Sequence, residues 1–173
     1  MQKKVTSALT TAFVISLILI VLDLVGGFTH VKFETWWRWI PTIVMCVALI
    51  WACIVYANQK DNLVTFGNVF MHGFLTSLII AGIMLIYTLL SVYVIFPETR
   101  DLALEQARRQ MESQGKLSED QIDQALEFTR KGFIVFLVIG VVIGTAIAGA
   151  ISSLLGAAFA KKKPVTPFDQ PTA

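Results

Sequence analysis

The sequence predicts an all-α fold: a four-helix transmembrane bundle with an extramembrane amphipathic helical hairpin between the third and fourth spans. Four long apolar runs cover most of the 173 residues, and each is long enough to cross a bilayer, which takes about 20 helical residues. Hydrophobic residues make up 55% of the chain and charged residues only 15%, with a mean hydropathy of +0.70. A soluble domain of this size could not bury so much apolar surface, so the composition indicates an integral membrane protein.

The first two spans are expected at about residues 8–27 and 39–57. Lys3 and Lys4 precede the first run, as basic residues do in a signal peptide. However, the run is longer than the roughly 7–15 residues of a signal-peptide core, and no small-residue cleavage site follows it. We therefore expect a retained first span. Three tryptophans within residues 36–39 mark the start of the second span, as in an interfacial aromatic belt.

The third span is expected at about residues 72–96, followed by a helical hairpin over residues 97–131. This hairpin segment holds eight of the twelve acidic residues and six of the fourteen basic ones. Gly115 predicts the end of its first helix, and Ser118 with Gln121 predicts a capping box that starts the second. Two interpretations of the hairpin remain open: a solvated connector, or a docking surface for a partner.

The fourth span is expected at about residues 133–159, before a disordered-like tail at 161–173. Small residues recur along it at every fourth position and form a predicted helix-packing interface: Gly140, Gly144, Ala148, Ser152 and Gly156. Such a row lets another helix backbone approach closely, and the fit of small residues is a main source of helix association in lipid. The contact could lie within the bundle or between molecules.

Two polar residues form a possible functional site within the spans. Asp23 is the only acidic residue inside a span, and it lies about 22 Å along the helix from Ala8, close to the far interface. It has either an interfacial, structural role or a role in ion or proton coupling. His72 enters the third span from the opposite side of the membrane, either as an interfacial histidine or as a ligand. Their separation argues against a direct proton relay between the two.

The sequence contains no recognisable enzyme signature, and we expect no enzymatic activity. It lacks the metalloprotease, phosphate-loop and nucleophile-elbow motifs, and no cysteines or histidines are paired at metal-binding spacing. Cys46 and Cys53 lie about 10 Å apart along one helix, too far for a disulfide. We therefore expect no catalytic residues, no cofactor and no metal. The net charge of +2 also argues against nucleic acid as a partner.

Basic residues at the chain ends act as predicted topology anchors: Lys3, Lys4, Lys161, Lys162 and Lys163. Four spans put both termini on one side, and the positive-inside rule places that side in the cytoplasm. The charge pattern is mixed, since Lys32, Arg38 and the six basic residues of the hairpin would lie on the other side. The lipid bilayer itself is the first expected partner.

Several short motifs together resemble a known family. They occur in the order Thr65-Phe66-Gly67, Phe70 and Gly73-Phe74, then Phe96-Pro97, then Glu112-Ser113-Gln114-Gly115-Lys116-Leu117-Ser118, and finally Lys163-Pro164 with Pro167-Phe168-Asp169-Gln170. With four spans, this order is similar to the bacterial membrane family called domain of unknown function 4199. The resemblance implies a four-helix inner-membrane protein of Gram-negative bacteria. It brings no established activity and no site residues.

Two hypotheses of function follow from the sequence. The first is an accessory or interaction protein that holds another membrane protein, such as one of envelope biogenesis, or self-associates through the fourth span. It rests on abundant packing surface with almost no chemistry. The alternative is a small homo-oligomeric transporter or channel that uses Asp23 as its coupling residue.

Overall fold

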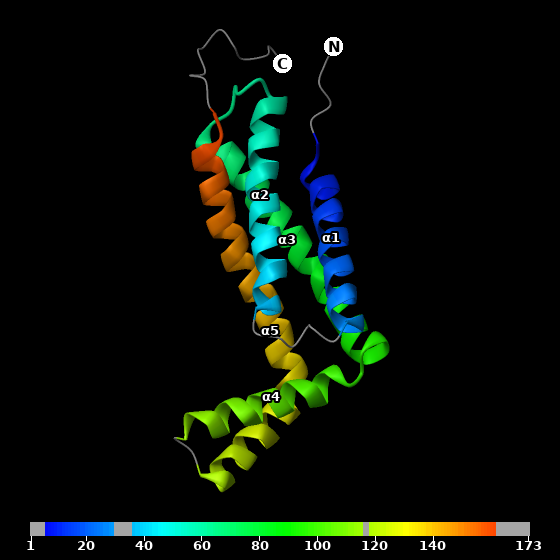
Figure 1. Cartoon of the computed structure of the whole chain (residues 1–173). Coiled ribbons are helices and arrows are strands. Elements are labelled where there is room, and N and C mark those ends of the chain that lie inside the picture. The colour runs from blue at the N-terminus through cyan, green and yellow to red at the C-terminus, as the bar shows by residue number, and fades with distance from the viewer. Residues whose placement is uncertain (1–5, 30–35, 116–117, 162–173) are drawn as a thin grey trace. The chain divides into compact units, whose positions relative to one another are not determined.

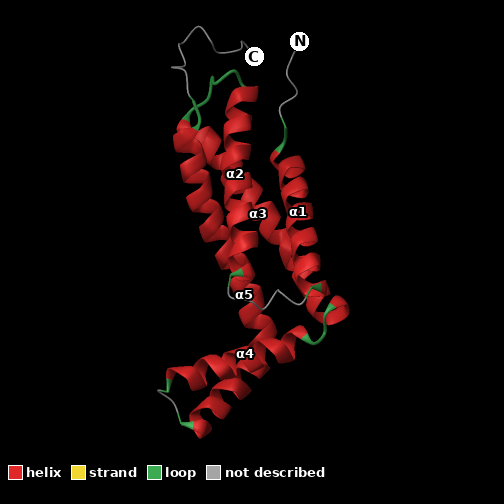
Figure 2. Ribbon diagram, in the orientation of Figure 1, coloured by secondary structure: helices red, strands yellow, loops and turns green. Residues whose placement is uncertain are grey.

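The computed structural model describes residues 6–29, 36–115 and 118–161, and these residues form an almost wholly helical chain (Figures 1 and 2). No strand occurs in these three ranges. The all-α prediction is therefore confirmed. The predicted tail lies outside the described residues except for Lys161. The helices in chain order are α1 (Ala8–Phe28), α2 (Ile40–Gln59), α3 (Phe66–Leu90), α4 (Thr99–Gln114) and α5 (Glu119–Phe159).

Four of these helices are long and apolar enough to cross a membrane, as the sequence predicts. They are α1, α2, α5 and the combined helix Phe66–Ile95, which consists of α3 and a π-helical turn that extends it. Their most apolar windows have mean hydropathies of 2.3 to 2.7. Helix α4 has no such window and carries many charges, consistent with its prediction as an extramembrane element.

The chain divides into two compact units, one formed by residues 1–84 and 144–173 and the other by residues 85–143. The first unit contains α1, α2 and parts of α3 and α5, which run in alternating directions (Figure 1). Its first core cluster brings together α1, α2 and α3 and consists of Ala12, Ile15, Leu19, Met45, Leu49 and Ile80. Ala148 of α5 packs against this cluster.

A second core cluster lies nearer the end of this unit where α2 ends and α3 begins. It consists of Cys53, Ala57, Val64, Val69, Ala157 and Ala160. At the same end, Thr6 and Gln59 are joined by two hydrogen bonds. The Thr6 backbone N–H donates to Gln59 Oε1 (2.7 Å), and Gln59 Nε2 donates to Thr6 Oγ1 (2.8 Å). The start of α1 is thereby fixed to the end of α2.

Helix α3 begins at Phe66, ahead of the expected start near residue 72. The Thr65 hydroxyl accepts a hydrogen bond from the backbone N–H of Asn68 at 3.2 Å, as an N-cap residue does. The composition of residues 58–69 predicts a loop, but this cap and the burial of Val69 extend the helix through the last four of them. The loop between α2 and α3 is correspondingly short.

The second unit contains the end of α3, the π-helical turn Ser91–Ile95, α4 and the first part of α5. Gly115 ends α4 in the left-handed conformation (φ 62°). Ser118 and Gln121 then form a reciprocal pair: the Ser118 N–H donates to Gln121 Oε1 (3.0 Å), and the Gln121 N–H donates to Ser118 Oγ (3.4 Å). The helix stop and the capping box thus occur where the sequence predicts them.

Helix α5 continues without a break from the hairpin into the fourth span and has 41 residues. The sequence divides this stretch into a hairpin ending near residue 131 and a span beginning near 133. Gly132 lies at the expected division, but a single glycine costs a helix only about 1 kcal/mol. Because no proline or turn sequence accompanies it, the helix is not interrupted.

Candidate functional site

The second half of α5 contacts its neighbours through glycine and serine, within the first unit. A Cβ atom added at Gly149 would lie 2.3 Å from both Cβ and Oγ of Ser77 on α3. One added at Gly156 would lie 2.7 Å from Cβ of Cys53 on α2. We call the contact that α5 makes here with α2 and α3 the seam. Its helices approach so closely that no larger residue fits at these two glycines.

The hydroxyl groups of the seam are used locally. Ser77 Oγ donates to the Phe74 carbonyl and Ser152 Oγ to the Ala148 carbonyl, each at 2.7 Å and within its own helix. The buried Ser153 hydroxyl has no hydrogen-bond partner among the described residues. The seam is therefore formed by close fit, not by hydrogen bonds between side chains of different helices.

The predicted helix-packing row divides into two parts. Ser152 and Gly156 are buried in the first unit, and Ala148 is partly buried against its core. In contrast, Gly140 and Gly144 are exposed, and a Cβ atom added at either would meet no atom within 4 Å.

The division has a geometric cause. An α-helix turns by about 100° per residue, so positions four apart drift by about 40° at each step. Gly140 and Gly156 are therefore about 160° apart around the helix axis. The two ends of the row therefore lie on different sides of an ideal helix. The four-residue spacing alone predicts one continuous interface and misses this rotation.

The fourth span is also the least covered of the four. Only 6% of its most apolar 18-residue window is buried by the chain, compared with 22–28% in the other three spans. Large side chains on the same stretch, such as Ile143 and Ile147, are more than half exposed. We call this exposed stretch, which includes Gly140, Gly144, Ile143 and Ile147, the open face of α5.

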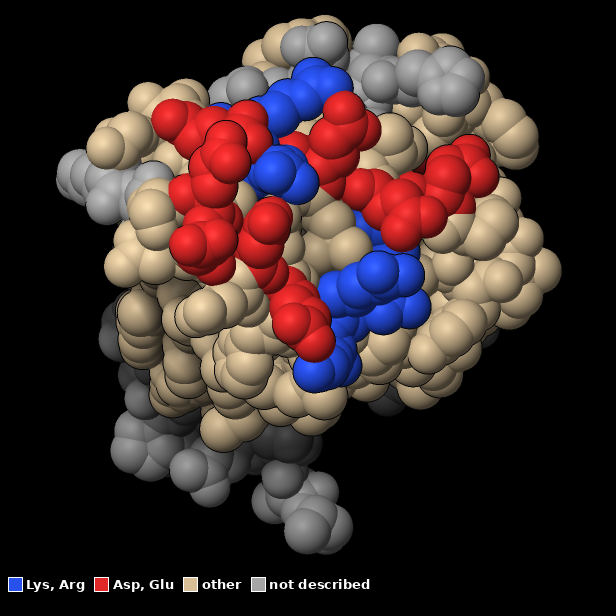
Figure 3. Space-filling model, turned by 90° about the horizontal axis from the view of Figure 1, so that it is seen from below, with Lys and Arg blue, Asp and Glu red and all other residues tan. Residues whose placement is uncertain are grey.

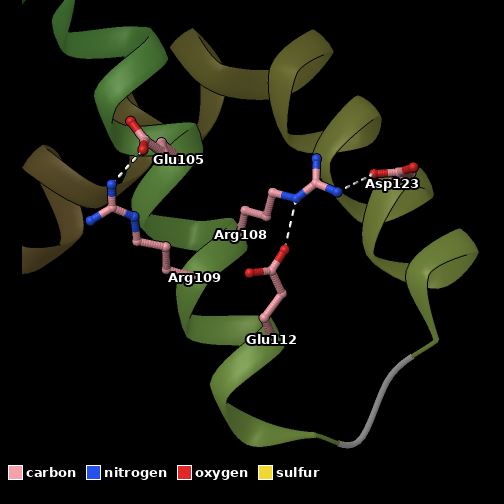
Figure 4. A network of polar contacts seen from close by, with 5 residues as sticks. All are labelled: Glu105, Arg108, Arg109, Glu112 and Asp123. Carbon is pink, nitrogen blue, oxygen red and sulfur yellow. Dashed lines mark hydrogen bonds and ion pairs between the residues drawn. The ribbon is translucent and has the colours of Figure 1, made fainter.

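The hairpin of the second unit carries ion pairs within and between its helices (Figure 4). Arg108 Nε donates to Glu112 Oε1 on the same helix at 2.8 Å, and its Nη2 lies 3.5 Å from Oδ1 of Asp123 on α5. Arg109 pairs with Glu105 one turn before it. Arg100 Nη2 also bridges the two helices by donating to the backbone carbonyl of Arg130 at 2.7 Å.

These charges lie on an exposed surface with both signs side by side (Figure 3). The hydrogen bond to Glu112 and the nearby negative charge of Asp123 raise the pKa of Arg108 above its ordinary value. Exposed pairs of this kind contribute little to stability because water and salt screen them. The hairpin is thus positioned by several weak contacts and leaves most of its charged surface accessible.

The two polar candidates within the spans lie far apart. Asp23 is half-buried near the end of α1, where it has an interaction partner. His72 is half-buried near the start of α3, at the end of the first unit where Thr6 and Gln59 meet. Since Asp23 is about 22 Å along α1 from Ala8, the two residues do not form one site.

His72 instead belongs to an aromatic and polar cluster that the sequence analysis misses. Its ring stacks on the Tyr56 ring, with centroids 4.0 Å apart and planes at 10°. Lys60 Nζ lies 5.5 Å from the centroid of the same tyrosine ring, within range of a cation–π interaction. Tyr56 and Lys60 are four residues apart at the end of α2, whereas His72 comes from α3, and no sequence spacing links it to the other two. Only their shared position near span ends could have indicated the cluster.

The remaining predicted residues contribute less to a site. Lys161 is exposed, and the other predicted anchors, Lys3, Lys4, Lys162 and Lys163, lie outside the described residues. Cys46 and Cys53 are free thiols. Residues 6–29, 36–115 and 118–161 contain no group of three or more His, Cys, Asp or Glu side chains able to hold a metal ion.

Comparison with curated proteins and with solved structures found no match. A family comparison did find one: residues 5–162 match the family described as "Protein of unknown function (DUF4199)". The match includes all five helices and thus both structural units. The four long apolar helices fit the membrane character expected from the sequence resemblance. The chain belongs to the DUF4199 family.

Proposed function

We propose that this protein is an integral membrane accessory protein that binds a helix of another membrane protein on the open face of α5. The observation that carries the proposal is the environment of Gly140 and Gly144, which have no neighbour to meet an added Cβ atom. Glycines inside the seam are explained by close packing within the chain. The open glycines have no such role, yet small residues are what a second transmembrane helix needs for close approach.

The hairpin supplies a second contact surface in this proposal. Its exposed acids and bases are suited to a polar partner surface outside the bilayer, while its internal ion pairs keep α4 beside α5. Complementary charge in such a surface contributes mainly to specificity and association rate. A partner from envelope biogenesis would fit this arrangement. The proposed role involves no catalysis.

The proposal places the protein in the inner membrane of a bacterium, with both termini in the cytoplasm. Support comes from the even number of apolar helices and from the basic residues at the chain ends. The variant Ser113→Cys gives a test, because Ser113 is exposed on the hairpin. A membrane-impermeant thiol reagent should label it from the periplasmic side. Labelling only after the cytoplasmic side is opened would contradict this orientation.

Native mass spectrometry of the tagged protein, extracted gently from its host membranes, tests the partner. We expect a stoichiometric foreign subunit that Gly144→Leu removes by filling the space for the partner helix. Gly82→Leu is a matched control, because Gly82 is an exposed glycine of α3 whose added Cβ also meets nothing within 4 Å. Equal retention of the subunit by both variants would refute the role of the open face.

A homo-oligomer without a foreign subunit would instead favour the transporter hypothesis. In that case Asp23→Asn should abolish transport or its growth phenotype while the protein still assembles. A fully active Asp23→Asn variant would exclude the coupling role of this carboxylate.

A further inference from the structure

A groove lies between α1 and α2 in the first unit. Its volume is about 390 Å³, within the range of about 300–1,000 Å³ typical of small-molecule sites. Val14 and Ile18 of α1 form one wall, and Trp51 and Val55 of α2 form the other. These walls are apolar, so the groove suits a hydrocarbon chain.

The polar groups of the groove lie mainly at one end. Thr6, Tyr56, Gln59 and His72 line it there. The paired hydrogen bonds between Thr6 and Gln59 connect the two walls at this end, and the stacked rings of Tyr56 and His72 add a flat amphipathic surface. The groove is therefore itself amphipathic, apolar along its length and polar at its mouth.

Basic residues predominate around the mouth. Lys60 lies over the Tyr56 ring and Lys161 follows the end of α5, while Asp61 is the acidic neighbour among the described residues. An anionic group is thus the favoured ligand at this end, because each basic side chain near the surface attracts anionic lipid.

We propose that this groove binds one acyl chain of an anionic phospholipid, with the phosphate of its headgroup at the mouth beside Lys60. The dimensions agree with a lipid of one leaflet. The α2 wall from Ala48 to Gln59 is about 16 Å long at 1.5 Å per residue, and one leaflet contributes half of the roughly 30 Å hydrocarbon thickness.

A flexible chain suits this space better than a protein helix. The groove walls carry bulky side chains such as Ile18 and Trp51, whereas close approach of a second transmembrane helix needs small residues. We therefore take a single acyl chain as the occupant. The lipid site lies on α1 and α2, so its test is independent of the partner helix proposed for α5.

Photocrosslinking tests the acyl-chain position. The full-length protein is reconstituted in vesicles of phosphatidylglycerol whose acyl chain bears a diazirine, and the labelled residues are mapped by peptide mass spectrometry. We expect label to concentrate on groove residues such as Trp51 and Val55. Val14→Trp, which fills the groove, should lower this label at least about tenfold, equal to about 1.4 kcal/mol of binding.

The matched control is Val21→Trp. Val21 is on the same helix and 51% exposed, close to the 55% of Val14, but it does not line the groove. This variant should keep the wild-type labelling. Label spread evenly over the exposed faces of all the helices, or lowered equally by the two tryptophan variants, would overturn the proposal.

A second experiment tests the headgroup and does not depend on filling the groove. Diazirine-labelled phosphatidylglycerol should label the groove more strongly than the matching phosphatidylcholine. Lys60→Gln should reduce this preference about fivefold, equal to about 1 kcal/mol per basic residue. Lys131→Gln, which removes the same charge from the hairpin, should leave the preference nearly unchanged. Equal labelling by both lipids in the wild type would overturn the choice of an anionic lipid.

Discussion

Replacing Gly149 by alanine perturbs the seam by a single methyl group. The added Cβ would lie 2.3 Å from Cβ and Oγ of Ser77, whereas ordinary contact begins at 3.4 Å. The serine hydroxyl can rotate away, but its Cβ is fixed to the α3 backbone. To restore ordinary contact, α5 and α3 must move apart by about 1.1 Å, the difference between these two distances.

The expected cost follows from comparison with Gly144→Ala on the same helix. Both substitutions gain the helix propensity of alanine over glycine, about 0.8–1 kcal/mol in peptides. Only Gly149→Ala adds overpacking, which typically costs 1–3 kcal/mol. Because the propensity terms cancel, Gly149→Ala should be less stable than Gly144→Ala by about 1–3 kcal/mol.

The assay is reversible unfolding in mixed micelles with increasing sodium dodecyl sulfate, followed by tryptophan fluorescence and far-ultraviolet circular dichroism. The double variant Gly149→Ala/Ser77→Gly restores the space and should recover most of the loss, which a double-mutant cycle measures as coupling. If Gly149→Ala is as stable as Gly144→Ala, or Ser77→Gly gives no recovery, the close contact is not present as described.

Two further predictions concern the hairpin. Ser118→Ala removes the cap of α5 and should increase amide hydrogen exchange in the first turn of the helix, by an amount equivalent to about 1 kcal/mol. The control is Ser113→Ala, which removes a hydroxyl from the last turn of α4 and should leave amide exchange in the first turn of α5 unchanged. Equal exchange rates in the two variants would contradict the capping role of Ser118. Gly115→Ala places a side chain at φ 62° and should destabilise the hairpin by about 1 kcal/mol relative to Gly115→Asn. Thermal unfolding of the two variants measures this difference. Equal melting temperatures would contradict the requirement for a left-handed conformation at residue 115.

Apolar run length was sufficient to predict the helices that could cross a membrane. Hydrocarbon thickness fixes how many residues a span needs, so the prediction depends on composition over about 20 positions and not on any single residue. The helix boundaries were less predictable. Thr65 extends α3 into a stretch that composition assigns to a loop, and Gly132 fails to end a helix although glycine is a weak helix former.

The site residues were predicted only in part, because their roles depend on neighbours from other helices. The four-residue spacing identifies Gly144 and Gly156 as small residues of one row. It does not reveal that Cys53 lies against Gly156, whereas no atom lies within 4 Å of a Cβ added at Gly144. Likewise, His72 could be picked out from the sequence, but its stacking partner Tyr56 comes from another helix. Contacts of this kind become visible only when the helices are placed side by side.

The seam between α5 and its neighbours selects residues by size. The Ser77 and Ser152 hydroxyls donate to carbonyls of their own helices, and the Ser153 hydroxyl has no hydrogen-bond partner among the described residues. No hydrogen bond between side chains therefore identifies the correct neighbour. The effect of exchanging glycine, alanine and serine at a seam position would therefore depend on the volume of the new side chain. The polarity of that side chain would have little effect on packing. In related chains the seam should vary freely in chemistry, provided that the summed volume of facing residues, such as Gly149 and Ser77, stays constant.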